Sequence, residues 1–200
     1  MLDLTSSSLF NVNTYLFYLI NGINNPILNY ILPIIASYGS NSLILILVLI
    51  FIFGGYYGRR VTILGIVALF LTIIIVILLK YIIAEPGPYV SLSNVNLLIP
   101  TTSSLVPSFP SGQTASSFAA ATIIGLKYRS KSDNGVVHWL IYPILLYASL
   151  IGFSLIYSGV HYPFDVICGA IIGIIVALTI LKYQNRILKN KIASYFSIKW

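Results

Sequence analysis

Long apolar stretches separated by short polar connections dominate the chain. Four of them meet the length that a helix needs to cross a bilayer core, about 20 residues with a range near 17–25. They cover residues 43–57, 61–83, 139–157 and 164–181. A fifth stretch, 111–126, opens with small polar residues, so we expect protein to line it on one side. The pattern therefore predicts five transmembrane helices.

Two further apolar stretches lie near the N-terminus, over residues 9–20 and 26–38, and both are interrupted by Asn or Pro. We interpret them as one or two short helices that lie in the membrane interface or re-enter it. A spanning helix in this region is the alternative topology. A cleaved signal peptide is not expected, because the first residues carry no basic side chain and the next apolar run contains Asn11 and Asn13.

Composition excludes a soluble globular protein. Hydrophobic residues make up 58% of the chain and charged residues 8%, whereas soluble domains carry roughly 25% charged residues. We therefore predict an all-α, polytopic membrane helix bundle. It forms a single membrane domain over residues 1–200, with the N-terminal helices in 1–40, the bundle in 43–181 and a basic tail in 182–200. The single cysteine, Cys168, excludes an intramolecular disulfide.

The basic residues predict the orientation. All but Lys80 of the eleven Lys and Arg residues fall on alternate connections between the predicted spans. These residues are Arg59, Arg60, Lys127, Arg129, Lys131, Lys182, Arg186, Lys189, Lys191 and Lys199. By the positive-inside rule, these connections and the C-terminus are cytoplasmic in a multi-pass protein of the cell membrane. The connections 84–109 and 158–163 then lie outside. Because the basic residues form no single patch, we expect no nucleic-acid partner.

Few ionisable residues lie away from the basic clusters, and four of them map to the outer membrane boundary. They are Lys80, Glu85, His161 and Asp165, and ionisable residues at membrane depth are functional by default. His161 and Asp165 lie four residues apart, so they share one face if that turn is helical. The carboxylate can then hold one imidazole nitrogen and leave the other free, which orients a nucleophile or base. The alternative is that His161 and Asp165 only cap the helix and pair with each other, with a structural role. We also expect Glu85 to pair with Lys80.

Three short motifs include these residues. They read Lys80-x6-Gly87-Pro88, then Pro110-Ser111-Gly112-Gln113, then Ser154-Leu155-x5-His161-x3-Asp165. Their order, spacing and place in the topology resemble the type 2 phosphatidic acid phosphatase superfamily of membrane lipid phosphatases, with motifs K-x6-R-P, P-S-G-H and S-R-x5-H-x3-D. The resemblance covers roughly residues 43–181.

The resemblance implies a role for each matched residue. His161 corresponds to the nucleophile that attacks phosphorus, and Asp165 to the carboxylate that orients it. Four residues correspond to the phosphate-binding set: Lys80, Ser111, Gly112 and Gln113. We expect neither a metal nor a cofactor. The expected partners are membrane lipids, including polyprenyl or phospholipid phosphates, and other membrane subunits.

Three positions depart from the family pattern. Gly87 and Leu155 replace arginines that hold phosphate oxygens, and Gln113 replaces the histidine that protonates the leaving group. A transition-state arginine supplies on the order of 10³–10⁵ in rate, and a general acid typically about 10²–10⁴. We therefore predict a catalytically impaired protein, a possible pseudoenzyme that serves as a lipid-binding protein or accessory subunit. The alternative is an active phosphatase of a polyprenyl diphosphate or another lipid phosphate, which forms a phosphohistidine. A diphosphate suits it, because its leaving group is a phosphate monoester.

Overall fold

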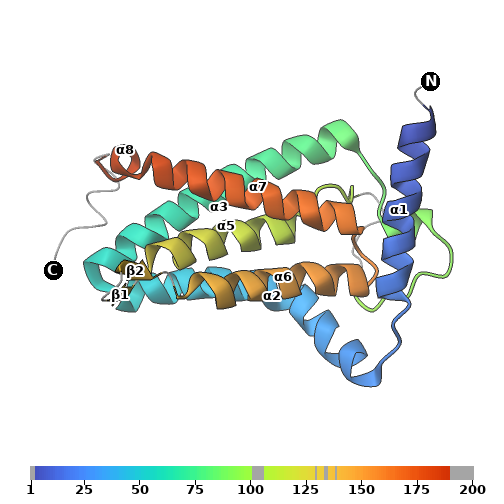
Figure 1. The fold of residues 1–200 in the computed structure, drawn as a ribbon, viewed down its shortest axis with the longest axis horizontal. Coiled ribbons are helices and arrows are strands. Elements are labelled where there is room, and N and C mark those ends of the chain that lie inside the picture. The colour runs from blue at the N-terminus through green and yellow to red at the C-terminus, as the bar shows by residue number, and fades with distance from the viewer. Residues whose placement is uncertain (1–2, 101–105, 129, 133–134, 138, 190–200) are drawn as a thin grey trace.

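The computed structural model describes residues 3–100, 106–128, 130–132, 135–137 and 139–189, and these form a helical bundle (Figure 1). The helices are α1 (Asp3–Asn21), α2 (Pro26–Phe53), α3 (Gly55–Ile83), α4 (Pro88–Ser91), α5 (Gly112–Lys127), α6 (Ile141–Tyr157), α7 (Pro163–Lys182) and α8 (Gln184–Lys189). A short antiparallel hairpin, β1 (Ser130–Ser132) and β2 (Gly135–Val137), joins α5 to α6. The helical fold is confirmed; the hairpin was not predicted. The C-terminal part of the predicted basic tail, 190–200, lies outside the described residues.

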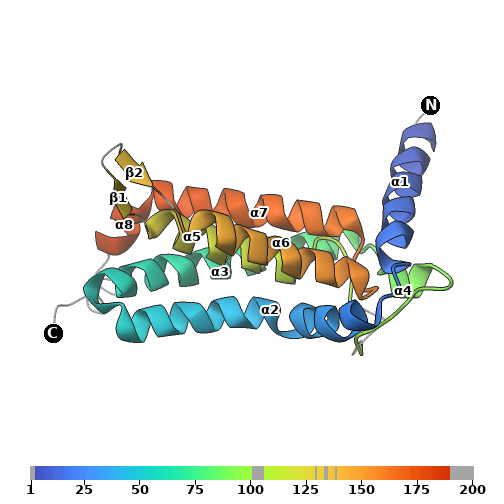
Figure 2. The same ribbon diagram turned by 60° about the horizontal axis from the view of Figure 1, so that its bottom comes forward.

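Helix α5 occupies the centre of the bundle, in contact with α2, α3, α6 and α7 (Figure 2). Its buried face consists largely of alanine, which lets neighbouring helices approach closely. Helix α7 approaches α5 through two glycines spaced four apart. A Cβ atom on Gly169 would lie 2.6 Å from the Ser111 carbonyl oxygen, and one on Gly173 would lie 2.2 Å from that of Ala115. This small-x3-small pair therefore forms a helix–helix contact of the kind common in membranes.

Helix α2 differs from the prediction, because it runs without interruption from Pro26 to Phe53. The sequence pattern divided this region into an interfacial segment and a separate span, and that division is wrong. Asn25 caps the helix by accepting hydrogen bonds from the Ile27 and Leu28 amides, at 2.9 and 3.2 Å. Pro33 lies inside it and removes one backbone donor, which favours a bend. Figure 1 shows that the first turns of α2 leave the direction of the remaining helix.

Helix α3 also begins earlier than predicted, at Gly55, so Arg59 and Arg60 lie in its first turns. The helices expected over 111–126, 139–157 and 164–181 are present as α5, α6 and α7, within two residues at each end. Their boundaries follow local signals. Ser111 caps α5, and Pro163 occupies the first turn of α7, where its missing N–H costs nothing.

Helix α1 lies across one end of the bundle (Figure 1), against α6 and α7. Two buried asparagines hold it there. The Asn13 side-chain oxygen accepts a hydrogen bond from the Phe164 amide at 3.1 Å. The Asn21 amide donates to the Asn96 and Tyr157 carbonyls, both at 2.9 Å, and its oxygen accepts from the Asn96 amide at 2.8 Å. Asn13, which interrupts the apolar pattern of this segment, and Asn21, at its end, thus attach α1 to the bundle.

The outward faces of the bundle are apolar, with exposed Ile, Leu and Phe side chains along α2, α3 and α7. Within the part of the chain that the structure describes, three segments are long and apolar enough to cross a membrane: Pro26–Phe53, Gly55–Ser91, which contains α3 and α4, and Pro163–Lys182. Helix α6 is apolar but shorter. Since a soluble protein would cover such faces with charge, the chain is a membrane protein.

Candidate active site

A cavity of about 440 Å³, with both polar and apolar lining residues, lies where α3 ends and α5 and α7 begin. This is the end of the bundle that α1 crosses in Figure 1. Segments that are far apart in the sequence line it, among them the last turn of α3, the start of α5 and the connection that precedes α7. The lining includes Lys80, Gly87, Tyr89, Ser108, Gly112, Gln113, Leu155 and His161. The three motifs therefore meet at one place.

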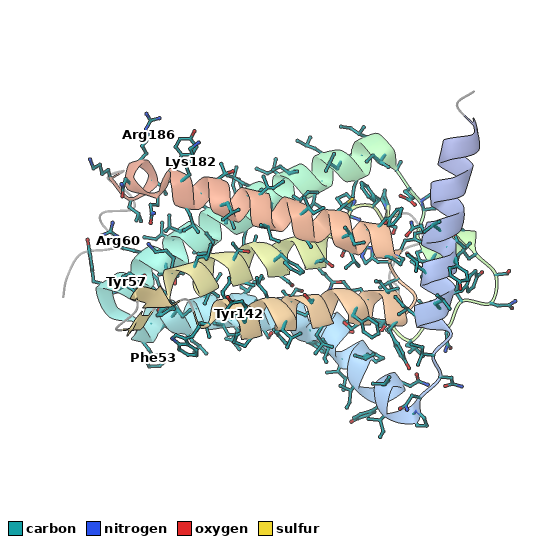
Figure 3. The ribbon with its side chains drawn as sticks, viewed as in Figure 1. Phe53, Tyr57, Arg60, Tyr142, Lys182 and Arg186 are labelled. Carbon is teal, nitrogen blue, oxygen red and sulfur yellow. The ribbon has the colours of Figure 1, made fainter. Side chains whose placement is uncertain are left out.

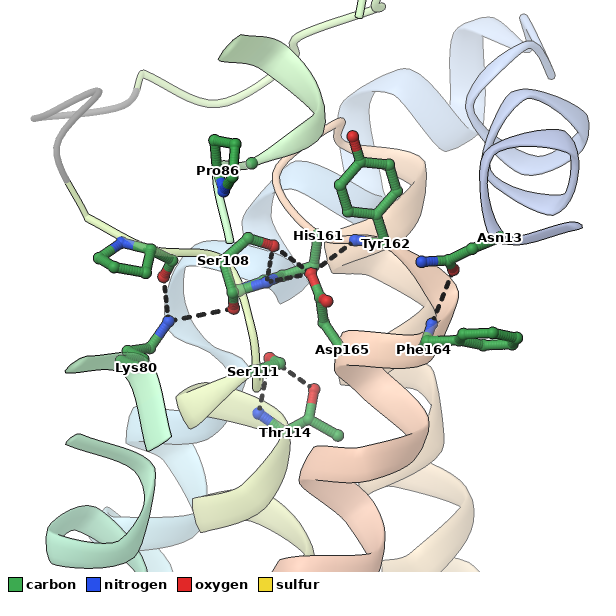
Figure 4. A network of polar contacts seen from close by, with 12 residues as sticks. Asn13, Lys80, Pro86, Ser108, Ser111, Thr114, His161, Tyr162, Phe164 and Asp165 are labelled. Carbon is green, nitrogen blue, oxygen red and sulfur yellow. Dashed lines mark hydrogen bonds and ion pairs between the residues drawn. The ribbon is translucent and has the colours of Figure 1, made fainter. Parts of the chain in front are cut away.

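His161 and Asp165 form a hydrogen-bonded pair at the start of α7 (Figure 4), with His161 Nδ1 3.2 Å from Asp165 Oδ2. Asp165 is fully buried, and Oδ2 also accepts a hydrogen bond from the Tyr162 amide at 2.8 Å. A carboxylate at this position of a helix commonly accepts from the cap residue. His161 faces the cavity, and among the described residues no hydrogen bond engages its Nε2. The imidazole is thus held at one nitrogen and unengaged at the other.

Ser108 joins this pair, and the sequence motifs did not predict it. Its hydroxyl donates to Asp165 Oδ2 and lies 3.4 Å from His161 Nδ1. Its backbone amide donates to the Glu85 carbonyl at 2.6 Å. The one signal in the sequence is a serine two residues before Pro110, which opens the second motif. Ser108 thus ties the connection before α5 to both α3 and α7.

Lys80 lies in the last turn of α3 and points into the cavity (Figure 4). Its ammonium group donates to the carbonyl oxygens of Pro107 and Ser108, the second at 3.0 Å. It forms no ion pair with Glu85, which does not line the cavity, so the expected pairing of these two residues is wrong. Because an ammonium group has three hydrogens, one remains for a ligand.

The second motif divides between the cavity and the bundle interior. Gly112 and Gln113 line the cavity, whereas Ser111 is fully buried and does not. The Ser111 hydroxyl accepts from the Thr114 amide at 3.3 Å and lies 2.9 Å from the Thr114 hydroxyl, so it caps α5. The Gln113 amide nitrogen donates to the Ala36 carbonyl at 3.1 Å and ties α5 to α2.

The positions that lack the family's arginines also border the cavity. A Cβ atom on Gly87 would lie 2.8 Å from the ring of Tyr89, so the tyrosine occupies space that a side chain at 87 would need. Leu155 is 1% exposed and belongs to the apolar core beneath the cavity. Among the described lining residues, Lys80 is the one lysine or arginine.

Tyr162 lies behind the pair, buried against Phe17 and Ile156. Burial raises the pKa of its hydroxyl, which therefore stays neutral beside Asp165. Among the described residues, no three His, Cys, Asp or Glu side chains come together in a way that could hold a metal ion. At the cavity an imidazole backed by a carboxylate lies near one ammonium group and neutral donors.

A family model for the PAP2 superfamily matches residues 61–189, more than half of the chain. The chain belongs to the PAP2 superfamily. This is the family that the three motifs resemble, so that resemblance is confirmed.

Individual PAP2 relatives match over most of the chain. The undecaprenyl-diphosphatase BcrC of Bacillus subtilis (strain 168) is 28% identical over 176 residues, which are 87% of this chain and 85% of the relative. The bacitracin transport permease protein BcrC of Bacillus licheniformis is 30% identical over 173 residues, 86% and 80% of the two chains. The crystal structure of Aquifex aeolicus LpxE is similar with a TM-score of 0.71 and 38% identity, covering 86% of this chain and 96% of that one.

These relatives overturn one prediction. The departures at 87, 113 and 155 favoured a catalytically impaired lipid-binding protein or accessory subunit. Relatives of nearly the same length include one named as an undecaprenyl-diphosphatase, and LpxE shares both fold and sequence. The pseudoenzyme interpretation is therefore wrong, and an active phosphatase is the better reading. Because residues of one site contribute non-additively, the rate factors of the three missing groups do not multiply into a loss of activity.

Proposed function

We propose that this protein is a membrane lipid phosphatase that works through a phosphohistidine on His161. The observation that carries the proposal is the His161–Asp165 pair, held at Nδ1 with Nε2 unengaged at a cavity that Lys80 also lines. A histidine oriented in this way by a buried carboxylate is suited to nucleophilic attack.

Each residue then has a role. Asp165 orients His161 and stabilises the positive charge that its ring gains on attack. Lys80 and the Gly112 amide bind phosphate oxygens, and Gln113 contributes its side-chain amide. Ser108 holds Asp165 rather than the substrate. Ser111 supports the site from the interior, since its hydroxyl caps α5.

The substrate that fits best is a polyprenyl diphosphate or a similar lipid phosphate. The name of the Bacillus subtilis relative supports this class. The chemistry agrees with it, because attack on the terminal phosphorus of a diphosphate releases a phosphate monoester. That leaving group needs less help from an acid than an alkoxide does, and no acid stands at position 113.

We further propose that α2, α3, α5, α6 and α7 span the cell membrane as a single domain, with the cavity outside and the C-terminus in the cytoplasm. Figure 3 supports this orientation, because it shows Arg60, Lys182 and Arg186 at the end of the bundle opposite α1. Arg60 lies over the Tyr56 ring and Lys182 over the Tyr183 ring, as in an interfacial belt.

Phosphate release tests the proposed function. The purified protein in detergent is offered several lipid phosphates and diphosphates, and inorganic phosphate is measured. We expect His161→Ala to abolish release, while His138→Ala, a change at the one other histidine, leaves it intact. Release that persists undiminished in His161→Ala would defeat the proposal.

A further inference from the structure

The charged and proton-donating groups at the cavity indicate which ionisation state of a phosphate substrate it binds. Lys80 supplies the one full positive charge among the described lining residues, and the carboxylate of Asp165 lies directly behind His161. With His161 neutral as a nucleophile, these charges sum to about zero. A dianionic phosphate would then bring two negative charges into a partly enclosed site with no net charge to balance them, which is costly.

At position 113 the cavity lacks the histidine that protonates the leaving group in the family pattern. Its ionisable side chains are Lys80 in α3, Tyr89 in α4 and His161 before α7, while α2, α5 and α6 contribute none. Gln113 is an amide and holds the Ala36 carbonyl. Glu85 does not line the cavity, and residues 101–105 contain no ionisable side chain.

Resting on the proposed function, we infer that this site uses phosphate monoesters in their singly protonated, monoanionic form, and that the substrate itself supplies the proton for its leaving group. One negative charge matches Lys80. The proton on the phosphoryl group replaces the acid that position 113 lacks. A monoanionic substrate therefore compensates both for the missing arginines at positions 87 and 155 and for the missing acid at position 113.

The reaction balances without another reactant. In the first step His161 Nε2 forms a bond to phosphorus, the bond to the ester oxygen breaks, and the phosphoryl proton moves to that oxygen to give the lipid alcohol. In the second step water adds to phosphorus as the bond to nitrogen breaks. Both protons of that water end on the released dihydrogen phosphate, and His161 returns to its neutral form.

This inference predicts a distinct pH dependence. The second pKa of a phosphate monoester lies near about 6, so the monoanion declines about tenfold for each pH unit well above that value. For an alkyl ester, whose leaving group requires the proton, kcat/KM falls with this slope above about pH 7. For 4-nitrophenyl phosphate, whose phenolate leaves without protonation, dianion that binds also reacts, so kcat/KM falls only to the lower value of the dianion and then levels off. The acidic limb, where His161 takes up a proton, is common to both substrates.

The test measures kcat and KM of the native protein for dioctanoyl phosphatidate and 4-nitrophenyl phosphate in detergent, from about pH 6 to about pH 9. A second arm uses Gln113→His, which we expect to flatten the decline of kcat/KM for the phosphatidate. Gln113→Asn, a shorter amide without an acid, is the matched control and keeps the native slope of kcat/KM against pH, whatever it does to the rate itself. In a third arm, Leu155→Arg or Gly87→Arg reduces the decline of kcat/KM for 4-nitrophenyl phosphate, and Leu155→Met does not.

Two results would count against the inference in different ways. A kcat/KM for phosphatidate that stays constant or rises above about pH 7, with phosphate released throughout, would overturn the monoanion inference and leave the phosphatase standing. No release from either ester at any pH, in the native protein and in Gln113→His alike, would remove the proposed function and this inference with it.

Discussion

At the residue scale, the contacts of Asp165 explain how a single histidine can be held ready for attack. Its Oδ2 meets the Ser108 hydroxyl, the Tyr162 amide and His161 Nδ1. These donors come from two segments, the connection before α5 and the turn before α7, so the carboxylate fixes the angle of the imidazole as well as its tautomer. Ser108 matters most among the added contacts, because it also carries the carbonyl that holds Lys80.

Ser108→Ala tests this role. The change removes the hydroxyl donor from Asp165 but keeps the backbone contacts, so the substrate still binds and the nucleophile is less well oriented. We expect kcat for a lipid phosphate to fall by about tenfold with little change in KM. Ser149→Ala, at an exposed serine on α6 with a local helix bond, is the control. A rise in KM at constant kcat would mean that Ser108 binds the substrate instead.

Several residues could be placed from the sequence because their signals are local. The contact between His161 and Asp165 could be expected from their spacing, although α7 begins only at Pro163 and Tyr162 is extended, so the turn that joins them is not helical. Lys80 and Gln113 could be placed from the motifs. Ser108 could not be found this way, since its neighbours Lys80 and Asp165 lie 28 and 57 residues away. The motif also suggested that Ser111 faces the substrate. A serine that caps a helix and a serine that binds phosphate can occupy the same position of such a motif, so the sequence alone does not distinguish them.

At the element scale, polar side chains and glycines position the helices around the site. Helices α5, α6 and α7 could be predicted within two residues because their apolar runs end at clear caps. Helix α2 could not, because Asn29 and Pro33 interrupt its apolar pattern. Asn29 is satisfied by tertiary contacts, accepting from the Tyr157 hydroxyl at 2.5 Å and donating to Asn24 at 2.8 Å.

The hydrogen bonds of Asn21 to Asn96 and Tyr157 predict that replacing Asn21 lowers both stability and activity. Asn21→Ala leaves the Asn96 amide and the Tyr157 carbonyl without their partner, at a cost of about 1–3 kcal/mol in unfolding free energy for each buried group left unpaired. Because the turn after Tyr157 leads to His161, we expect turnover to fall as well. Thermal unfolding in detergent and phosphate release measure the two effects. Asn185→Ala, on exposed α8, should change neither. If Asn21→Ala were equally mild, the hydrogen bonds of Asn21 would not be needed to hold α1 in place.

The close contact of α5 and α7 predicts that Gly173 tolerates no side chain. Gly173→Ala places a methyl group against the Ala115 carbonyl, and overpacking of this kind costs about 1–3 kcal/mol. We expect a lower unfolding midpoint in detergent. Ile175→Ala, on the exposed face of the same helix, serves as the control. If Gly173→Ala were as stable as the native protein, α7 would not pack on α5 through this glycine.

At the scale of the whole molecule, one polar end and one basic end give the bundle its proposed direction in the membrane. The basic residues predict which end faces the cytoplasm, but the number of spans depends on whether α2 and α6 cross fully. The apolar pattern alone cannot decide this, because length and hydropathy describe a segment and not its depth.

Cysteine labelling tests the orientation. After Cys168→Ala removes the native thiol, single cysteines replace Asn94, in the loop beside the site, and Lys189, at the end of α8. An impermeant maleimide added to intact cells should label the first position and leave the second unlabelled until the membrane is opened. Labelling of both positions from outside would contradict the proposed topology.

The most direct measurement for the whole account is the covalent state of His161 during turnover. The native protein is mixed with a lipid phosphate, quenched at alkaline pH, where phosphohistidine survives, digested and analysed by mass spectrometry. The proposed mechanism predicts phosphate on the peptide that contains His161, with no such adduct in His161→Ala. Phosphate release by the native protein that never passes through a phosphorylated His161, even when the quench is as fast as one turnover, would contradict it.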